Sequence, residues 1–258
     1  HSIGHRVLRR HAETLGFNRS FTIQDREDAK GLVNACIAEA EIDVKATRFP
    51  KPDVVGDIGS LALNKQQSVR EVIEERYPWF EPLAAQIEDV LIRYTARKQA
   101  QGLMDFDDLL VLWLKLLKEH EDVRELYQKR FQFVLVDEYQ DTNQLQAELI
   151  DLLGERYKNV MVVGDDSQSI YSWRGANYEN IIEFPKRYPK AQVYKIETNY
   201  RSTPEILQLA NAAIAANTRQ FAKELAASRG SGEKPVVAVC SAADEQAAFV
   251  AQRALELR

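Results

Sequence analysis

Cysteine is scarce in this sequence: only Cys36 and Cys240 occur among 258 residues, and they form no CxxC pair. This usage argues against a disulfide framework and a cysteine zinc site, and it predicts a reducing, cytoplasmic setting. No apolar run approaches the roughly 20 residues of a membrane-spanning helix. The first residues, HSIGHRVLRRH, contain no hydrophobic signal-peptide core. We therefore expect a soluble protein that is not exported and has no membrane partner.

An excess of positive charge is also missing. The formal net charge is -5, with 28% charged residues, so any contact with nucleic acid has to come from a local patch. The length and the 45% hydrophobic content allow one large domain or two ordinary ones. The chain starts with histidine rather than methionine, and its last residues still have the pattern of an amphipathic helix. We expect both ends to be internal to a longer protein.

Residues 24–103 have the composition of a helical block, rich in Glu, Lys, Arg, Gln, Ala and Leu. Apolar residues there recur at helical spacing, for example at Val69, Val72 and Ile73. Two prolines and two glycines within residues 49–60 predict a turn that interrupts the helices.

From about residue 104 the pattern changes to strands that alternate with helices. Strands are predicted at Phe131–Val136, Val160–Val163, 192–196 and 235–239, and helices at 105–120, 143–153, near Asn180, at 203–217 and at the C-terminal end. Residues 217–234 have the composition of a surface loop. Continuous apolar strands separated by helices indicate an α/β fold with a parallel sheet buried on both faces.

Two acidic residues, Asp137 and Glu138, follow the first of these strands. Ligands of open parallel sheets bind beyond the carboxyl ends of the strands, where both side chains are expected. One carboxylate can hold Mg²⁺, while its neighbour, which points elsewhere, can orient or deprotonate a water molecule. Alternatively, the acids cap the helix that begins near Asn143.

Polar groups also follow the second strand, in the segment VGDDSQSIYSWRGA. Asp165 and Gln168 are expected at the same sheet edge as the first acidic pair. Tyr171, Trp173 and Arg174 come directly after them, and aromatic rings beside an arginine suit base stacking and phosphate pairing. The alternative is that both rings are ordinary buried aromatics.

The segment ETNYRSTPEIL follows the third predicted strand. Tyr200 could cover a flat ring, and Arg201 could reach a phosphate. A surface ion pair of Arg201 is the alternative interpretation.

These stretches together resemble helicase motifs of superfamily 1 DNA helicases of the UvrD/Rep/PcrA type. LVDEYQDTN is similar to their Walker B motif, VGDDSQSIYSWRGA to the following glutamine and tryptophan motif, and NYRS to the arginine motif that opens the second motor domain. HSIGHRVLRRH and MDFDDLL are supporting matches, so the similarity spans essentially the whole chain.

The resemblance implies an architecture as well as an activity. It implies a RecA-like parallel-sheet motor domain (residues 1–23 and 104–192), a helical insertion (24–103) and the start of a second RecA-like domain (193–258). It also implies an ATP-dependent helicase or translocase that moves from 3′ to 5′ on single-stranded DNA and acts at junctions with duplex DNA. Repair or replication proteins are implied partners, and a nucleoid-associated cytoplasmic location follows.

The same resemblance assigns roles residue by residue. It implies that Asp137 holds Mg²⁺ and that Glu138 activates the attacking water. Gln168 would sense the γ-phosphate of ATP, Tyr200 would stack on adenine, and Arg201 would act as an arginine finger. The residues implied to contact DNA are Tyr171, Trp173, Arg174 and, at the start of the chain, His1.

Two features depart from the family pattern. Ser167 replaces a third aspartate before the glutamine, which affects the surroundings of Gln168. The phosphate cradle G-x-x-x-x-G-K-[ST] does not occur in the chain. We therefore expect an internal fragment that does not hydrolyse ATP efficiently by itself. Two other functions remain open: a non-catalytic module that binds single-stranded DNA or a partner protein, and the helicase subunit of a recombinational helicase-nuclease.

Other clusters are open to simpler interpretations. His1, His5 and His11 have partly helical spacing, which suits a solvated helix face better than a metal site. The basic residues of RVLRRH and of RKQAQG, near residue 97, could meet DNA phosphates or lie on solvated faces.

Overall fold

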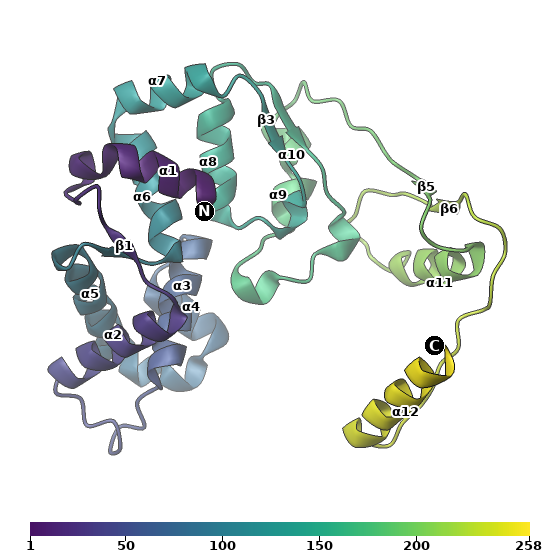
Figure 1. Ribbon diagram of the computed structural model, residues 1–258, viewed down its shortest axis with the longest axis horizontal. Coiled ribbons are helices and arrows are strands. Elements are labelled where there is room, and N and C mark those ends of the chain that lie inside the picture. Colours follow the sequence, from purple (N-terminus) through teal and green to yellow (C-terminus); the bar gives the residue numbers. More distant parts are fainter. The chain divides into compact units, whose positions relative to one another are not determined.

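The computed structural model describes residues 1–258 and divides into two units, His1–Pro189 and Lys190–Arg258 (Figure 1). Helices dominate the first unit, which also contains two pairs of short parallel strands. The second unit contains two helices and one pair of two-residue strands. None of the helices has both the length and the apolar character that crossing a membrane requires.

The helical block expected at residues 24–103 is confirmed. It contains α2 (Arg26–Glu39), α3 (Pro52–Lys65), α4 (Val69–Arg76), the 3-10 helix η2 (Pro78–Leu83) and α5 (Ala84–Ala100). Ile58, Ile73 and Ile87 come from three different helices of the block and are fully buried together. Burial of one such side chain contributes about 1.5–3 kcal/mol. The block therefore has a hydrophobic core of its own.

The interruption expected near residues 49–60 is confirmed only at its start, because the break in the helices covers residues 40–51. Pro52 lies at the first position of α3, where its missing N–H group would have no helical partner in any case. Both glycines of the segment lie inside α3. A Cβ atom on Gly59 would come within 2.6 Å of Leu91 Cδ2, so this glycine allows α3 to pack closely against α5.

A parallel strand pair joins the two ends of the helical block. β1 (Thr22–Ile23) pairs with β2 (Leu103–Met104), with Thr22 opposite Leu103. The next helix, α6 (Phe106–Glu119), begins directly after this pair because Asp105 and Asp108 form a capping box at its first turn.

The remaining α-helices of the first unit are α1 (Ser2–His11), α6, α7 (Glu121–Arg130), α8 (Gln144–Gly154), α9 (Glu179–Ile182) and α10 (Phe184–Arg187), and a 3-10 helix, η1 (Ala12–Leu15), follows α1. Four of them, α1, α6, α7 and α8, contribute buried residues to a second hydrophobic cluster. Leu116 and Leu117 of α6 are fully buried in this cluster, against Leu145 and Leu149 of α8. The helices predicted at 105–120, at 143–153 and near Asn180 are thus confirmed.

The parallel strands predicted around residues 134 and 160 are confirmed, although both are shorter than expected. β3 (Val134–Val136), labelled in Figure 1, pairs in parallel with β4 (Val160–Val162). Leu135 lies opposite Met161 in this pair. Helix α8 lies between the two strands in sequence, as a parallel connection requires.

Burial of this sheet on both faces is a prediction that proved wrong. Val134 packs against the cluster that contains α8, whereas Leu135 and Met161 are 72% and 58% exposed. Successive side chains of a strand point to opposite faces. The helices of the first unit cover one face, so the apolar side chains of the other face remain in contact with solvent.

The second unit is built around α11 (Pro204–Ile214), with α12 (Ala243–Glu256) near its C-terminal end. These two helices are confirmed predictions. β5 (Thr198–Asn199) pairs in parallel with β6 (Ala226–Ala227), which falls inside the segment predicted as a loop. Leu207 of α11 is the one buried apolar side chain of this unit.

The strands predicted at 192–196 and 235–239 do not form. Tyr194 and Ile196 are 85% and 79% exposed, and Val237 is 86% exposed. Their β-branched and aromatic side chains favour extended backbone, but a strand also requires a neighbouring strand for its hydrogen bonds. Neither segment has such a neighbour in the structure.

Candidate nucleotide and nucleic-acid site

The acidic loop, residues 137–143, leaves the carboxyl end of β3 with both acids exposed. The backbone N–H of Glu138 donates to Asp137 Oδ1 at 3.0 Å. Glu138 adopts the left-handed conformation, with φ 50° and ψ 43°. For a residue other than glycine this conformation costs on the order of 1–3 kcal/mol and is common at functional sites. The surrounding loop holds Glu138 in place against that cost.

Neither acid caps the following helix. Asn143 performs that role, because its Oδ1 accepts from the N–H of Gln146 at 2.8 Å and its own N–H donates to Gln146 Oε1 at 3.0 Å. The capping interpretation of Asp137 and Glu138 is therefore wrong, and both carboxylates remain available at the sheet edge.

Gln140 links the acidic loop to the loop that follows β4, and the sequence analysis did not identify it. Its side chain is only 1% exposed. The amide Nε2 donates to Glu138 Oε2 at 2.8 Å, and the amide oxygen accepts from the N–H of Asp165 at 3.0 Å. Asp165 Oδ2 accepts in turn from Gln168 Nε2 at 2.7 Å. A continuous path of hydrogen bonds therefore brings Glu138 and Gln168 into one site.

Gly164 leaves no room for a side chain where these two loops meet. A Cβ atom on Gly164 would lie 2.5 Å from Gln140 Oε1 and 2.8 Å from Ile181 Cδ1. The N–H of Tyr139 also donates to the carbonyl oxygen of Val163 at 2.9 Å, which extends the pairing of β3 and β4 into the loops. A larger residue at this position would displace the side chain of Gln140 or Ile181.

Charge repulsion is visible within the acidic loop. Burial, followed by the charge of Glu138, raises the pKa of Asp141 above its usual value.

Ser167, which departs from the family pattern, donates its N–H to Asp165 Oδ1 at 3.0 Å. Its hydroxyl is buried without a partner, so Ser167 supports this turn through its backbone.

The aromatic loop, residues 171–176, presents its rings to solvent. Tyr171 is 41% and Trp173 is 59% exposed, so the interpretation of both as buried core aromatics is wrong. The Arg174 guanidinium lies 4.5 Å from the centroid of the Trp173 ring and 5.8 Å from that of Tyr171. This arrangement places a cation beside two exposed rings, which suits stacked bases and their phosphates.

The arginine turn, residues 199–202, belongs to the second unit. Asn199 Oδ1 accepts from the N–H groups of Arg201 at 2.9 Å and Ser202 at 2.7 Å, so one side chain defines the turn. Tyr200 is 76% exposed, and Arg201 is also exposed. Both side chains are therefore accessible to a ligand that binds the second unit.

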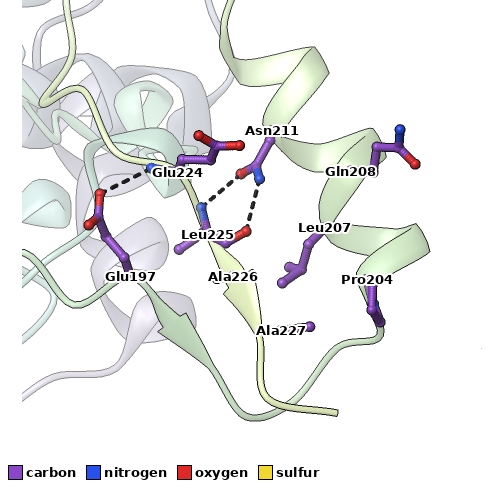
Figure 2. Close-up of a pocket in the computed structure, with 9 residues that line it drawn as sticks. All are labelled: Glu197, Pro204, Leu207, Gln208, Asn211, Glu224, Leu225, Ala226 and Ala227. Carbon is purple, nitrogen blue, oxygen red and sulfur yellow. Dashed lines mark hydrogen bonds between the residues drawn. The ribbon is translucent and has the colours of Figure 1, made fainter. Parts of the chain in front are cut away.

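A pocket of about 660 Å³ lies beside this turn (Figure 2). Asn211 of α11 donates to the carbonyl oxygen of Leu225 at 2.9 Å and accepts from its N–H at 3.1 Å, which fixes the segment before β6 against the helix. Figure 2 shows both bonds. Neither Tyr200 nor Arg201 lines the pocket, which is therefore separate from the predicted site residues.

The three N-terminal histidines do not converge. His1 packs edge-on against Phe106, with ring centroids 5.8 Å apart, and His5 Nε2 accepts from Arg9 Nε at 3.0 Å. Burial lowers the pKa of His11, which packs against Tyr127. No group of three or more His, Cys, Asp or Glu side chains in the structure could hold a metal ion. His1 remains an exposed candidate for contact with DNA.

Lys98 corrects the expectation that the basic segment near residue 97 is solvated. Its side chain is buried, and Nζ lies 2.5 Å from Asp105 Oδ2 and 2.6 Å from Asp108 Oδ2. Burial, together with the charge of Asp105, raises the pKa of Asp108 to about 6. Tyr94 also donates its hydroxyl to Asp105 at 2.8 Å. This buried ionic cluster connects α5 with the start of α6.

Comparison with known proteins covers both units. The family model of the UvrD/REP helicase N-terminal domain matches residues 1–189, and that of the UvrD-like helicase C-terminal domain matches residues 194–258. The ATP-dependent DNA helicase PcrA of Staphylococcus aureus is 38% identical over 234 residues, 91% of this chain and 31% of that protein. PcrA of Bacillus subtilis is 39% identical over 225 residues, 87% of this chain and 30% of that protein. The chain spans about a third of the length of these curated relatives.

Proposed function

The chain belongs to the UvrD/REP helicase family, and from this premise we propose that it forms part of an ATP-dependent DNA helicase. The activity is proposed for the full-length protein that carries this sequence. It consists of 3′ to 5′ movement along single-stranded DNA and unwinding at junctions with duplex DNA. Repair or replication proteins in the cytoplasm are the proposed partners.

The proposed domains follow the order of the elements. Residues 1–23 and 104–192 form a RecA-like first motor domain, residues 24–103 a helical insertion, and residues 193–258 part of a second motor domain. Two observations support this division. The β1–β2 pair joins the ends of the helical block, and the structure divides into units between Pro189 and Lys190.

The chain offers suitable side chains for Mg²⁺ and ATP. Mg²⁺ is commonly bound through one or two carboxylates plus substrate phosphates and water, and the exposed carboxylate of Asp137 fits this use. Gln168, Tyr200 and Arg201 are the proposed nucleotide contacts, at the γ-phosphate, the adenine and the phosphates respectively. When bound, Mg²⁺ neutralises charge on the transferring phosphoryl group.

The observation that carries the proposal is the hydrogen-bonded path from Glu138 through Gln140 and Asp165 to Gln168. It holds a proposed water-activating carboxylate and a proposed phosphate sensor in fixed relation. Phosphoryl transfer depends mainly on positioning and charge stabilisation, so a frame of this kind is what the reaction requires. The carboxylate of Glu138 can orient a water molecule and accept its proton.

The proposed DNA contacts are Tyr171, Trp173, Arg174 and His1. Each base stacked on an aromatic ring contributes about 1–3 kcal/mol to binding, measured by truncation of the ring. The exposure of Trp173 and the position of Arg174 over its ring support this assignment. Release and recapture of bases at these rings, in step with ATP turnover, would move the protein along the strand.

The test is ATP hydrolysis by the full-length protein with and without single-stranded DNA. We expect DNA to stimulate hydrolysis, and we expect Glu138→Gln to lower kcat by about 10²–10⁴-fold because a general base contributes on that scale. Binding of ATP should remain, since the variant keeps the shape of the side chain. Hydrolysis by Glu138→Gln at the wild-type rate would remove Glu138 from the role of general base.

A second candidate function is a module that binds single-stranded DNA without catalysis. The exposed aromatic loop supports this function as much as it supports the helicase. Salt titration of binding to a fluorescent oligonucleotide, with and without Mg²⁺-ATP, separates the two. The 258-residue chain has no G-x-x-x-x-G-K-[ST] motif, so we expect it alone to bind DNA in a salt-dependent way that ignores ATP. A full-length protein that also ignores ATP would support the module, and a nuclease activity would instead support a helicase-nuclease subunit.

A further inference from the structure

Asn64, near the C-terminal end of α3, uses both ends of its side-chain amide. The Nδ2 group donates to Asp107 Oδ1 at 2.9 Å and to the carbonyl oxygen of Ser60 at 2.9 Å. The Oδ1 atom accepts from Asn143 Nδ2 at 2.6 Å. One side chain of the helical block therefore joins the start of α6 to the end of the acidic loop.

Asn143 passes this connection on to the acidic loop. It caps α8 through Gln146, and its carbonyl oxygen accepts from Asn180 Nδ2 at 3.2 Å. Asn180 is buried and also donates to the carbonyl oxygen of Thr142 at 2.9 Å. A shift of Asn64 therefore acts on Asn143, which is also hydrogen-bonded to Gln146 and Asn180.

The aromatic loop packs against the same part of α3. Gly175 has φ +86°, and a Cβ atom on it would lie 3.2 Å from Asn64 Cβ and 3.5 Å from Leu61 Cδ1. On its other side the loop pairs with the acidic loop, since Ala176 forms a β-bridge with Asn143. The aromatic loop is therefore held between Asn64 and the acidic loop.

The charge of Asp107 favours a neutral hydrogen-bond donor over a carboxylate at position 64. Burial raises the pKa of Asp107, while hydrogen bonds from Ser60 and Asn64 oppose this rise. A neutral donor at position 64 stabilises the carboxylate. A second carboxylate there would repel it and would have no proton to donate.

We propose that Asn64 is a positioning residue that couples the aromatic loop to the acidic loop, so that DNA bound at the rings stimulates ATP turnover. The proposal rests on the proposed function for its catalytic effect. The contact network on both sides of Asn64 provides the physical connection that coupling between two loops requires. The hydrogen-bond partners of the Asn64 side chain are Ser60, Asp107 and Asn143, and none of these is a proposed nucleotide or DNA contact.

The test uses three variants of the full-length protein. Asn64→Asp removes the donor to Asp107 and adds a facing charge, whereas the double variant Asn64→Asp with Asp107→Asn restores the pair with donor and acceptor exchanged. Asn34→Asp makes the same chemical change on the exposed face of α2 and is the matched control.

We expect Asn64→Asp to lower DNA-stimulated kcat about tenfold, a typical size for coupling between sites, with the KM for ATP changed less than about twofold. The double variant should recover most of this loss, and Asn34→Asp should behave as wild type. Unchanged stimulation in Asn64→Asp would overturn the proposal. A loss that persists in the double variant after its melting temperature recovers would also overturn it.

Hydrogen exchange of the 258-residue chain tests the coupling without catalysis. Faster exchange at residues 143–147 and 174–177 in Asn64→Asp, reversed in the double variant, would support it. Unchanged exchange in both segments would overturn it. A wild-type protein without DNA-stimulated hydrolysis would contradict the proposed function, and the exchange result would still decide the coupling.

Discussion

The acidic loop and the arginine turn present their proposed catalytic side chains in different ways. Glu138 is exposed, but its neighbours Tyr139 and Gln140 are 0% and 1% exposed, so a buried frame positions it. Arg201 is also exposed, but its turn is defined by the side chain of Asn199 in a unit with one buried apolar side chain. Buried neighbours therefore position Glu138 in the first unit, whereas the second unit has no comparable buried frame beside Arg201.

Arg201→Ala tests this comparison with the largest expected effect. If Arg201 is an arginine finger, the variant of the full-length protein should lose about 10³–10⁵-fold in kcat. The melting temperature should stay close to that of wild type because the side chain is exposed.

Steady-state ATP hydrolysis and thermal unfolding measure the two effects. Arg253→Ala, a change of an exposed arginine on α12 that pairs with Glu256, is the control. A large loss of stability in Arg201→Ala would show that the arginine side chain is part of a buried frame after all, and an unchanged kcat would remove its catalytic role.

The buried ionic cluster of the first unit predicts a dependence on pH. The pKa of Asp108 is raised to about 6 by burial and by Asp105. The folded state then holds more protons than the unfolded state between about pH 4 and 6, so the free energy of unfolding falls as pH rises through that window. Asp108→Asn should remove about 2 kcal/mol of this fall.

Chemical denaturation between pH 4 and 7 measures the slope. Asp105 has the opposite sign: burial disfavours its charge, but Lys98 and hydrogen bonds lower its pKa, so its contribution is lost as pH falls below about 4. Glu74→Gln, on an exposed face of α4, is the control. An unchanged slope in Asp108→Asn would place the titrating group elsewhere.

Gly164→Ala tests the frame around the acids with a smaller effect. The added Cβ would approach Gln140 Oε1 to 2.5 Å, and such overpacking costs about 1–3 kcal/mol. The melting temperature should fall, and kcat should fall with it because Gln140 holds Glu138.

The matched control is Gly31→Ala, because Gly31 lies in α2 with no atom within 4 Å of an added Cβ. This change should raise stability by about 0.5–1 kcal/mol. Thermal unfolding of both variants checks the pair. Equal effects of the two substitutions would show that the loops around Gly164 adjust freely.

Patterns of residues close together in the sequence correctly predicted several helices and strands. The helix from Gln144 follows from the capping chemistry of Asn143 and from apolar spacing, and β3 and β4 follow from continuous apolar runs. The motifs likewise indicated Glu138 and Gln168 before any geometry was known. The failed strands at 192–196 and 235–239 show the limit, since a strand depends on a partner that its own residues do not specify.

The sequence by itself determined the family motifs, the helix starts and the order of strands and helices, because these depend on residues close together in the chain. Only the tertiary structure decided that Gln140 is buried between Glu138 and Asp165, that Lys98 is buried with two aspartates, and that Asn64 meets Asn143 across 79 positions. A glutamine, a lysine or an asparagine is compatible with solvent or with the interior. Burial makes the hydrogen bonds of Gln140 and Lys98 obligatory, and the packing of distant elements decides which environment each residue has.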